Sequence, residues 1–179
     1  CQVDMKRKIL KQTELFKALD ETALEHIAEL MEERSYDHND VIIKKMDTDT
    51  SMFIIASGGV NIYYRKGDNE DLLLGHLVAG QHFGEMSLFD DRPRSALVKA
   101  VGPTTTYVIE KKALFTLIDV EKEVGIRILM SVASELSRRL RDTSTALYVS
   151  LCIGDNILDQ DDIDKLNVEF NCIKMEESK

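Results

Sequence analysis

The residues best suited to chemistry lie close together near the middle of the chain. Gly84 and Glu85 come first, a short apolar run follows at residues 86–89, and Arg94 and Ser95 stand a few positions further on. Glycine lets backbone N–H groups approach an anion closely, and the start of a short helix presents unpaired N–H groups. Arginine adds a planar fork for two phosphate oxygens, and serine adds one more donor. The spacing therefore predicts a phosphate-binding loop.

Glu85 is the unexpected member of this group, because a carboxylate next to a phosphate repels it. The arrangement makes sense if the carboxylate accepts hydrogen bonds from a ribose hydroxyl while a nearby cation compensates its charge. The sequence also allows a simpler alternative, an ordinary surface turn in which Glu85 forms a salt bridge with Arg94. We favour the ribose interpretation, because the surrounding elements fit a pocket.

Helices are predicted before this loop, and strands on both sides of it. Residues 3–34 have helical spacing, and Asp20 is a plausible cap for a second helix from Ala23 to Glu33. From residue 35 the apolar period changes to two, and turn-forming residues at 57–59 and 102–103 separate short strands. The predicted strands are 41–44, 52–55, 60–64, 72–77, 95–101 and 105–110.

Helical spacing returns at Lys111, with a short helix to Asp119 and a long one from Glu121 to about Leu151. The long helix has apolar or small residues at steps of three or four, the spacing of a coiled-coil seam. It either covers its own barrel or pairs with a second copy, and its length favours a homodimer through residues 121–151. The seam residues are Leu129, Val132, Leu136, Leu140, Thr143, Leu147 and Ser150.

These elements predict an α+β protein that is mainly β. We expect an antiparallel jelly-roll β-barrel, flanked by N-terminal helices and by the long C-terminal dimerisation helix. The phosphate-binding loop interrupts the barrel between two strands, so it can line a pocket inside it. We place this domain at residues 1–151 and an acidic tail at residues 152–179, whose spacing does not fit an EF-hand and which predicts a short helix near 160–166 or a docking segment.

Composition narrows the functional classes. The 179 residues are 44% apolar with a formal net charge of −9, which argues against DNA or an anionic membrane as a partner of the whole chain. No apolar run is long enough to span a membrane. The cysteines Cys1, Cys152 and Cys172 lie far apart, which predicts no zinc site and a reducing, cytoplasmic location. Cys1 at the start fits a trimmed chain better than a lipoprotein.

Catalytic machinery is not evident in the sequence. No Ser/His/Asp set, metal cluster or phosphate-binding Walker motif appears, and the four histidines are scattered. We therefore expect a binding protein that is not an enzyme and that needs no metal.

The loop resembles the phosphate-binding cassette of cyclic nucleotide-binding domains. The matching residues are Phe83-Gly84-Glu85-Met86-Ser87-Leu88 followed by Arg94-Ser95-Ala96. The resemblance extends over about residues 10–151 and is closest to the bacterial catabolite activator branch. The stretch between Glu85 and Arg94 is one residue shorter than in that branch, and it is closer to the spacing of protein kinase regulatory subunits.

The resemblance implies a role for each site residue, with cyclic AMP as the ligand and cyclic GMP as a possible one. It places the phosphate on Arg94, Ser95 and the backbone of Gly84, Met86 and Ser87, and the ribose on Glu85. Ile62, Leu74 and Met86 would pack on the sugar and base. Thr143 would meet the base within one subunit, Ser144 would reach it from the partner, and Arg139 would couple the pocket to the helix.

The expected function is cyclic nucleotide sensing by a regulatory module with an unknown downstream partner. Relatives that bind DNA carry a helix-turn-helix domain after the long helix. Only the acidic residues 152–179 follow it here, so we expect no DNA-binding output unless the chain is truncated. The alternative is a structural or interaction protein whose pocket is vestigial or takes another ligand. The intact pairs Gly84-Glu85 and Arg94-Ser95 argue against it.

Overall fold

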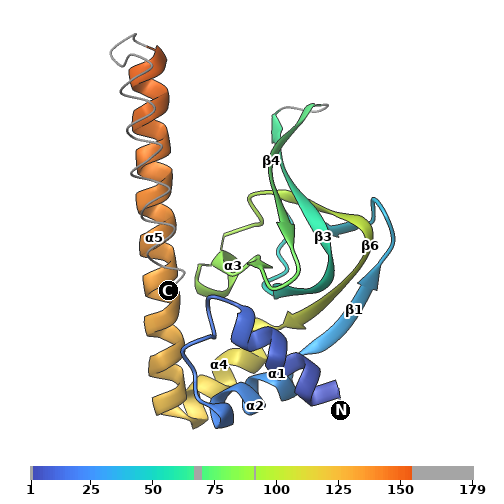
Figure 1. Ribbon diagram of the computed structural model, residues 1–179, viewed down its shortest axis with the longest axis vertical. Helices are drawn as coiled ribbons and strands as arrows, with labels where there is room; N and C mark the ends of the chain where they lie inside the picture. The colour runs from blue at the N-terminus through green and yellow to red at the C-terminus, as the bar shows by residue number, and fades with distance from the viewer. Residues whose placement is uncertain (1, 67–69, 91, 155–179) are drawn as a thin grey trace. The chain divides into compact units, whose positions relative to one another are not determined.

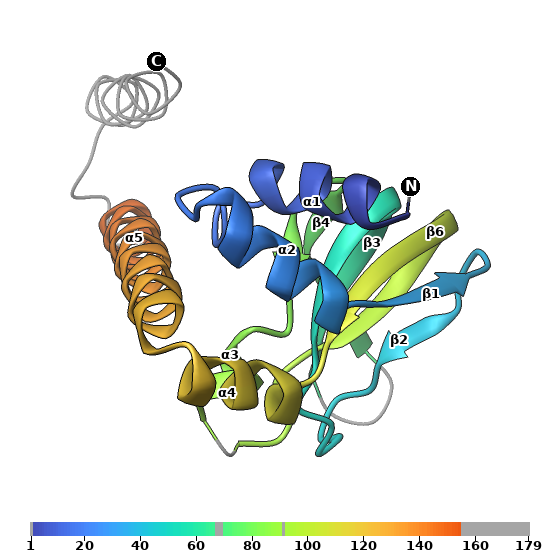
Figure 2. The ribbon, with the colours of Figure 1, turned by 90° about the horizontal axis from the view of Figure 1, so that it is seen from below.

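The computed structural model describes residues 2–66, 70–90 and 92–154. Contacts between residues divide the chain into two units, residues 1–132 and residues 133–179. In the first unit, three helices gather at one end of an antiparallel sheet (Figures 1 and 2). These helices are α1 (Gln2–Gln12), α2 (Glu21–Leu30) and α4 (Lys111–Val120).

The predicted cap of the second helix is confirmed, but the predicted end of that helix is wrong. The Oδ1 atom of Asp20 accepts a hydrogen bond from the N–H of Ala23 at 2.9 Å, and this bond begins α2. The helix stops at Leu30, and residues Glu32–Tyr36 form strand β1. Because β1 is charged and polar, its sequence lacks the apolar alternation of a strand. Its hydrogen-bond partner, β6, comes from the far end of the domain.

The six strands of the described residues belong to one antiparallel sheet, which confirms the prediction of mainly β structure flanked by helices. Its order is β1-β6-β3-β4, with β2 paired to β6 and β5 paired to β3. Among the described strands no pairing joins β1 to β4, so these pairings do not close the sheet into a barrel. The strands after β1 are β2 (Val41–Ile43), β3 (Met52–Lys66), β4 (Glu70–Val78), β5 (His82–Phe83) and β6 (Leu97–Ile109).

The turns predicted at residues 57–59 and 102–103 are wrong, because both segments lie inside long strands. Gly58 in β3 and Gly102 in β6 have φ values of +78° and +72°, which other residues rarely adopt. A Cβ atom on Gly58 would stand 2.4 Å from the carbonyl oxygen of Pro103. The two glycine-containing segments therefore lie against each other, and they let the paired strands bend together without ending.

The core of the first unit has two parts. One lies among the helices and includes Phe16, Ile27 and Leu114. It also contains Val132, which is 5% exposed, so this member of the predicted seam packs in its own domain instead. The other part lies on the sheet around Phe53, whose ring stacks on another phenylalanine with centroids 5.0 Å apart.

Two further helices have the predicted positions. The short helix α3 (Met86–Phe89) forms in the predicted phosphate-binding loop. The long helix α5 (Lys122–Gly154) begins in the first unit and continues into the second. Its predicted seam residues Leu136, Leu140 and Leu147 are 36%, 68% and 59% exposed. No described helix combines the length and the apolar character needed to cross a bilayer. The helix predicted near residues 160–166 lies outside the described residues.

Candidate functional site

Arg94 stands between α3 and β6 at the centre of the predicted site. Only 3% of it is exposed, and its guanidinium meets groups from two other segments. Nη1 donates to the carbonyl oxygen of Gly84 at 2.9 Å. Nη2 donates to the Asp49 carboxylate at 2.8 Å and to the carbonyl oxygen of Ser51. The guanidinium carbon lies 5.8 Å from the centroid of the Phe53 ring. These contacts fix the orientation of the cation.

One nitrogen of this guanidinium makes no hydrogen bond with the described residues. The Nε atom of Arg94 is buried and has no hydrogen-bond partner within the described part of the chain. A buried donor without a partner destabilises a protein by about 1–3 kcal/mol. Most buried polar groups are paired, so an exception needs an explanation. An acceptor from outside the described residues, such as an anion or a water molecule, would satisfy this donor.

Asp49 is the carboxylate that the structure pairs with Arg94. Burial alone would raise the pKa of Asp49, but hydrogen bonds from Arg94 and Ser51 outweigh it and hold the pKa below its ordinary value. The Asp49 side chain is 46% exposed, so water screens much of this attraction. The pair therefore orients the guanidinium more than it neutralises the local charge.

Gly84 has a structural reason to be glycine. Its φ is +79°, and a Cβ atom there would stand 2.7 Å from Nη1 of Arg94 and 3.1 Å from the carbonyl oxygen of Ser51. A side chain would push the guanidinium away from both carbonyl groups. The sequence predicts that Gly84 admits a phosphate, and the structure adds that it admits the arginine.

Three further predicted residues follow Gly84 at the start of α3. Glu85 and Ser87 are buried, with exposures of 3% and 6%, whereas Met86 is 56% exposed. The N–H of Leu88 donates to the carbonyl oxygen of Glu85 at 3.0 Å, which closes the short helical turn. A buried carboxylate next to Gly84 keeps an acidic group in the site, and Met86 offers an uncovered apolar surface.

The remaining predicted residues of the first unit lie on or beside the sheet. Ser95 is exposed and directly follows Arg94. Ile62 in β3 is partly buried and packs on the same apolar cluster as Phe53. Leu74 in β4 is 59% exposed, and it lies at a shift in the strand register, where it has no residue opposite it in β3.

The predicted residues of the second unit all lie on α5. Arg139 donates from Nε to Glu135 at 2.8 Å, and Glu135 also accepts two bonds from Arg138, at 3.0 and 2.9 Å. Burial alone would raise the pKa of Glu135, but these arginines outweigh it and hold the pKa below its ordinary value. Thr143 and Ser144 are exposed. Arg139 is therefore held by its own helix.

The sequence does not predict two of the residues that contact Arg94. Asp49 and Ser51 lie more than forty positions before Arg94, in a loop of alternating acidic and hydroxyl residues. Nothing in the local spacing of that loop indicates an arginine partner. Only the pairing of distant strands brings the two segments together, so an inference from local motifs does not reach them.

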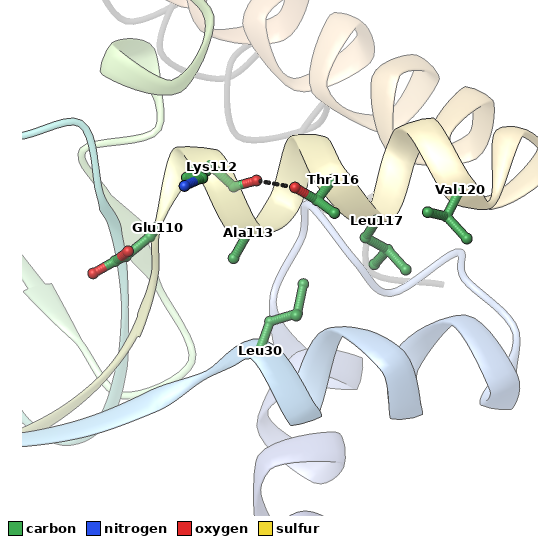
Figure 3. Close-up of a pocket in the computed structure, with 7 residues that line it drawn as sticks. All are labelled: Leu30, Glu110, Lys112, Ala113, Thr116, Leu117 and Val120. Atoms are coloured by element: carbon green, nitrogen blue, oxygen red, sulfur yellow. Dashed lines mark hydrogen bonds between the residues drawn. The ribbon is translucent and has the colours of Figure 1, made fainter.

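Among the described residues, the site around Arg94 coincides neither with a metal-binding cluster nor with the pocket between α2 and α4. Within the described residues, no group of three His, Cys, Asp or Glu residues is placed to hold a metal ion. A pocket of about 440 Å³ lies between α2 and α4 (Figure 3). Its wall is mainly aliphatic, and none of its residues contacts Arg94. The lining residues are Leu30, Glu110, Lys112, Ala113, Thr116, Leu117 and Val120.

Comparison with known proteins identifies the domain. Residues 33–121 match the family described as the cyclic nucleotide-binding domain. The cAMP-dependent protein kinase type II regulatory subunit of Drosophila melanogaster is 34% identical over 98 residues, which are 55% of this chain and 26% of that protein. The cAMP-activated global transcriptional regulator CRP of Haemophilus influenzae is 32% identical over 110 residues, which are 61% and 47% of the two chains.

Solved structures agree with this assignment. The catabolite activator protein of Thermus thermophilus superimposes with a TM-score of 0.69 at 26% identity, over 76% of this chain and 62% of that one. The regulatory domain of Toxoplasma gondii PKA, crystallised with cAMP, superimposes with a TM-score of 0.60 at 26% identity. The match covers 64% of this chain and 44% of that one. The chain therefore contains a cyclic nucleotide-binding domain, as residues 83–96 predict. It spans about a quarter of the kinase subunits it matches and about half of the transcriptional regulators.

Proposed function

We propose that the chain is a non-catalytic regulatory module that senses cyclic AMP, with cyclic GMP as a second possible ligand. The observation that carries this proposal is the spare Nε donor of Arg94. Because Nε is buried, the groups that cover it must move before a phosphate oxygen can reach it, but the guanidinium itself is already oriented by protein acceptors. Such preorganisation reduces the entropy that binding must overcome.

The phosphate and the ribose would be bound by neighbouring parts of the loop. Arg94 and Ser95 donate to the phosphate, together with backbone N–H groups between Gly84 and Ser87. Glu85 accepts a hydrogen bond from the ribose hydroxyl. The Arg94 cation compensates part of the repulsion between this carboxylate and the phosphate.

The base would lie on apolar side chains. Leu74 and Met86 are large and more than half exposed, and Ile62 lies partly buried on the sheet. Covering such side chains with a purine removes apolar surface from water and contributes to binding. The exposure of Leu74 and Met86 is consistent with this role, because both side chains have apolar surface that a ligand could cover.

The long helix would complete the sensor. We propose that it forms a homodimer through residues 121–151 in a jelly-roll domain of residues 1–151. In this arrangement Thr143 meets the adenine within a subunit and Ser144 meets it from the partner. Arg139, held by its own helix, would couple the pocket to that helix. A downstream partner, in the cytoplasm and other than DNA or a membrane, would read the state of the dimer.

Signalling by such a module requires more than binding. The ligand shifts the dimer only if it binds one conformation more tightly than another. Contacts between the ligand and α5 supply that difference if α5 moves between the two conformations. The module then needs no catalytic step, which agrees with a family defined by binding.

The test is a calorimetric titration of the full chain with cyclic AMP, cyclic GMP, AMP and ATP. We expect the cyclic nucleotides alone to bind, because the open phosphates carry additional charge and do not fit the same cradle. Arg94→Ala should weaken binding of cyclic AMP by roughly a hundredfold. Arg92→Ala, which removes an exposed arginine two positions earlier, should leave binding unchanged. Equal binding of AMP and cyclic AMP, or no binding of either cyclic nucleotide, contradicts the proposal.

A further inference from the structure

The segment that leads into β6 exposes a basic motif next to the candidate site. Residues 92–95 read Arg-Pro-Arg-Ser, and they lie in neither a helix nor a strand. Arg92, Pro93 and Ser95 are exposed, whereas Arg94 is buried. The guanidinium of Arg92 makes no hydrogen bond or ion pair with the part of the chain that the structure describes. The candidate-site chemistry does not use it.

We propose that Ser95 is a phosphorylation site for an arginine-directed serine kinase, and that its phosphate closes the pocket to cyclic nucleotides. This inference rests on the function proposed above. In the reaction, Oγ of Ser95 attacks the γ-phosphorus of ATP. The new O–P bond replaces the bond to ADP, and the hydroxyl proton passes to the kinase base. ATP supplies the phosphoryl group, and no other co-reactant is required.

The exposed arginine gives the motif its recognition element. Kinases that select Arg-x-x-Ser hold that arginine in an acidic pocket through charge-assisted hydrogen bonds. Arg92 stands three positions before Ser95, and its guanidinium is available for such a pocket. Arg94 takes no part in this recognition, because Asp49 and backbone carbonyl groups hold it inside the domain. Ser87 is 6% exposed and lacks an arginine at the same spacing, so it is a natural negative control.

The backbone around Ser95 can open locally, so that Ser95 can reach the active site of a kinase. Two backbone hydrogen bonds tie the segment to the loop before β3, in addition to the bonds from the Arg94 guanidinium to Asp49 and Ser51. The N–H of Arg94 donates to the carbonyl oxygen of Asp47, and the N–H of Met46 donates to the carbonyl oxygen of Arg94, both at 2.9 Å. Met46 has a φ of +68°, a strained conformation for a side chain of its size, and it is 67% exposed. Opening these two backbone bonds relieves the strain at Met46 and lets the backbone around Ser95 extend, while the bonds of the guanidinium keep the Arg94 side chain in the domain.

The consequence for the pocket follows from charge. A phosphoserine carries about −1.5 to −2 charges at neutral pH and presents three acceptor oxygens. On Ser95 it stands next to Arg94, the residue with the spare donor. It competes for that donor and repels the phosphate of an incoming nucleotide. We expect the affinity for cyclic AMP to fall at least about a hundredfold.

The test uses the full chain with ATP, Mg²⁺ and the catalytic domain of a calmodulin-dependent kinase that selects Arg-x-x-Ser. Mass spectrometry should place a phosphate on Ser95 and leave Ser87 unmodified. Arg92→Ala should slow the modification at least about tenfold, because it removes the recognised cation. No phosphate on Ser95 of the folded protein, or the same rate in Arg92→Ala, overturns the assignment of the site.

Calorimetry with cyclic AMP then tests the effect on the pocket. The phosphorylated chain should bind at least about a hundredfold more weakly than the unmodified chain. Ser95→Asp should bind more weakly than Ser95→Asn, which has the same shape without the charge. Equal affinity of the phosphorylated and unmodified chains overturns the blocking effect. Failure of the unmodified chain to bind is different: it overturns the proposed function, while the phosphate map still decides whether Ser95 is modified.

Discussion

The site around Arg94 and the charged cluster on α5 hold their arginines in different ways. Arg94 meets acceptors from residues 49–51 and from Gly84, so its position depends on a loop that is distant in the sequence and on the turn after β5. Arg139 meets Glu135, one turn away on the same helix. The first arrangement requires the tertiary fold, whereas the second forms wherever the helix forms. We infer that the first unit provides a preorganised anion site and that the α5 residues acquire their roles only through a ligand or a second copy.

The largest expected effect comes from Arg94 itself. Arg94→Ala should weaken cyclic AMP binding by about 3 kcal/mol, or roughly a hundredfold, because the phosphate loses its charged partner. Arg94→Lys should recover only part of this loss, since an ammonium group cannot replace the planar fork. Calorimetric titration measures both. Arg139→Ala should have a much smaller effect, and an equal loss in the two alanine variants would break the comparison between the regions.

Gly84 tests how tightly the first region is built. Gly84→Ala places a Cβ atom at a positive φ and 2.7 Å from Nη1 of Arg94. It should lower the free energy of unfolding by about 1–3 kcal/mol and also weaken ligand binding. Urea denaturation measures the change in stability. Gly75→Ala is the matched control, because a Cβ atom there meets nothing within 4 Å. Similar losses in both variants would mean that the close approach to Arg94 is unimportant.

The tests at Arg94 and Gly84 concern contacts that the sequence alone does not predict. The loop from Gly84 to Ser95 can be predicted, because its functional residues are local and its spacing is distinctive. The partners Asp49 and Ser51 cannot be predicted in this way, because the pairing of strands brings their segment to Arg94 from a distant part of the sequence. Strand β1 is missed for the same reason: its charged residues become a strand only by pairing with β6. The glycines at 58 and 102 look like turns in the sequence, yet they bend two strands that continue.

Oligomeric state tests the expectation for α5. Leu140 is 68% exposed and would lie in the seam of a homodimer. Leu140→Asp should release monomers, because an unpaired charge in an apolar seam is strongly unfavourable. Light scattering at micromolar concentration gives the mass. Ser134→Asp, at an exposed position outside the predicted seam, should leave the dimer intact. A monomeric wild type would contradict the dimer proposal, but it would not contradict the proposed anion site around Arg94.

A smaller effect is expected from Ser144. Ser144→Ala should weaken cyclic AMP binding by about 0.5–1.5 kcal/mol in the dimer, the usual contribution of one hydrogen bond. In the Leu140→Asp background it should change nothing, since the partner no longer supplies the hydroxyl. Titration of the single and double variants measures this dependence. A loss of the same size in the monomer would show that Ser144 acts within its own subunit.

Acid pH should produce the smallest effect. The pKa values of Asp49 and Glu135 are both lowered in the folded state. Each carboxylate therefore stabilises the protein above its unfolded pKa, and this contribution is lost as the pH falls through the folded value. Asp49 is half exposed, so its contribution to the free energy of unfolding is well under about 1 kcal/mol. Asp49→Asn should flatten the decline in melting temperature below about pH 4, the ordinary carboxyl range. An unchanged pH profile would show that the pair with Arg94 adds no stability.

The central claim is that the spare donor of Arg94 binds the phosphate of a cyclic nucleotide. Nitrogen-15 NMR of the arginine side chains tests it directly, with the Nε–H resonance of Arg94 assigned by its loss in Arg94→Lys. On addition of cyclic AMP, this resonance should move downfield and exchange more slowly with water, as expected when a buried donor gains a charged acceptor. Adenosine, which lacks the phosphate, should leave it unchanged. Saturating cyclic AMP binding with no change at Arg94 Nε–H would contradict the account.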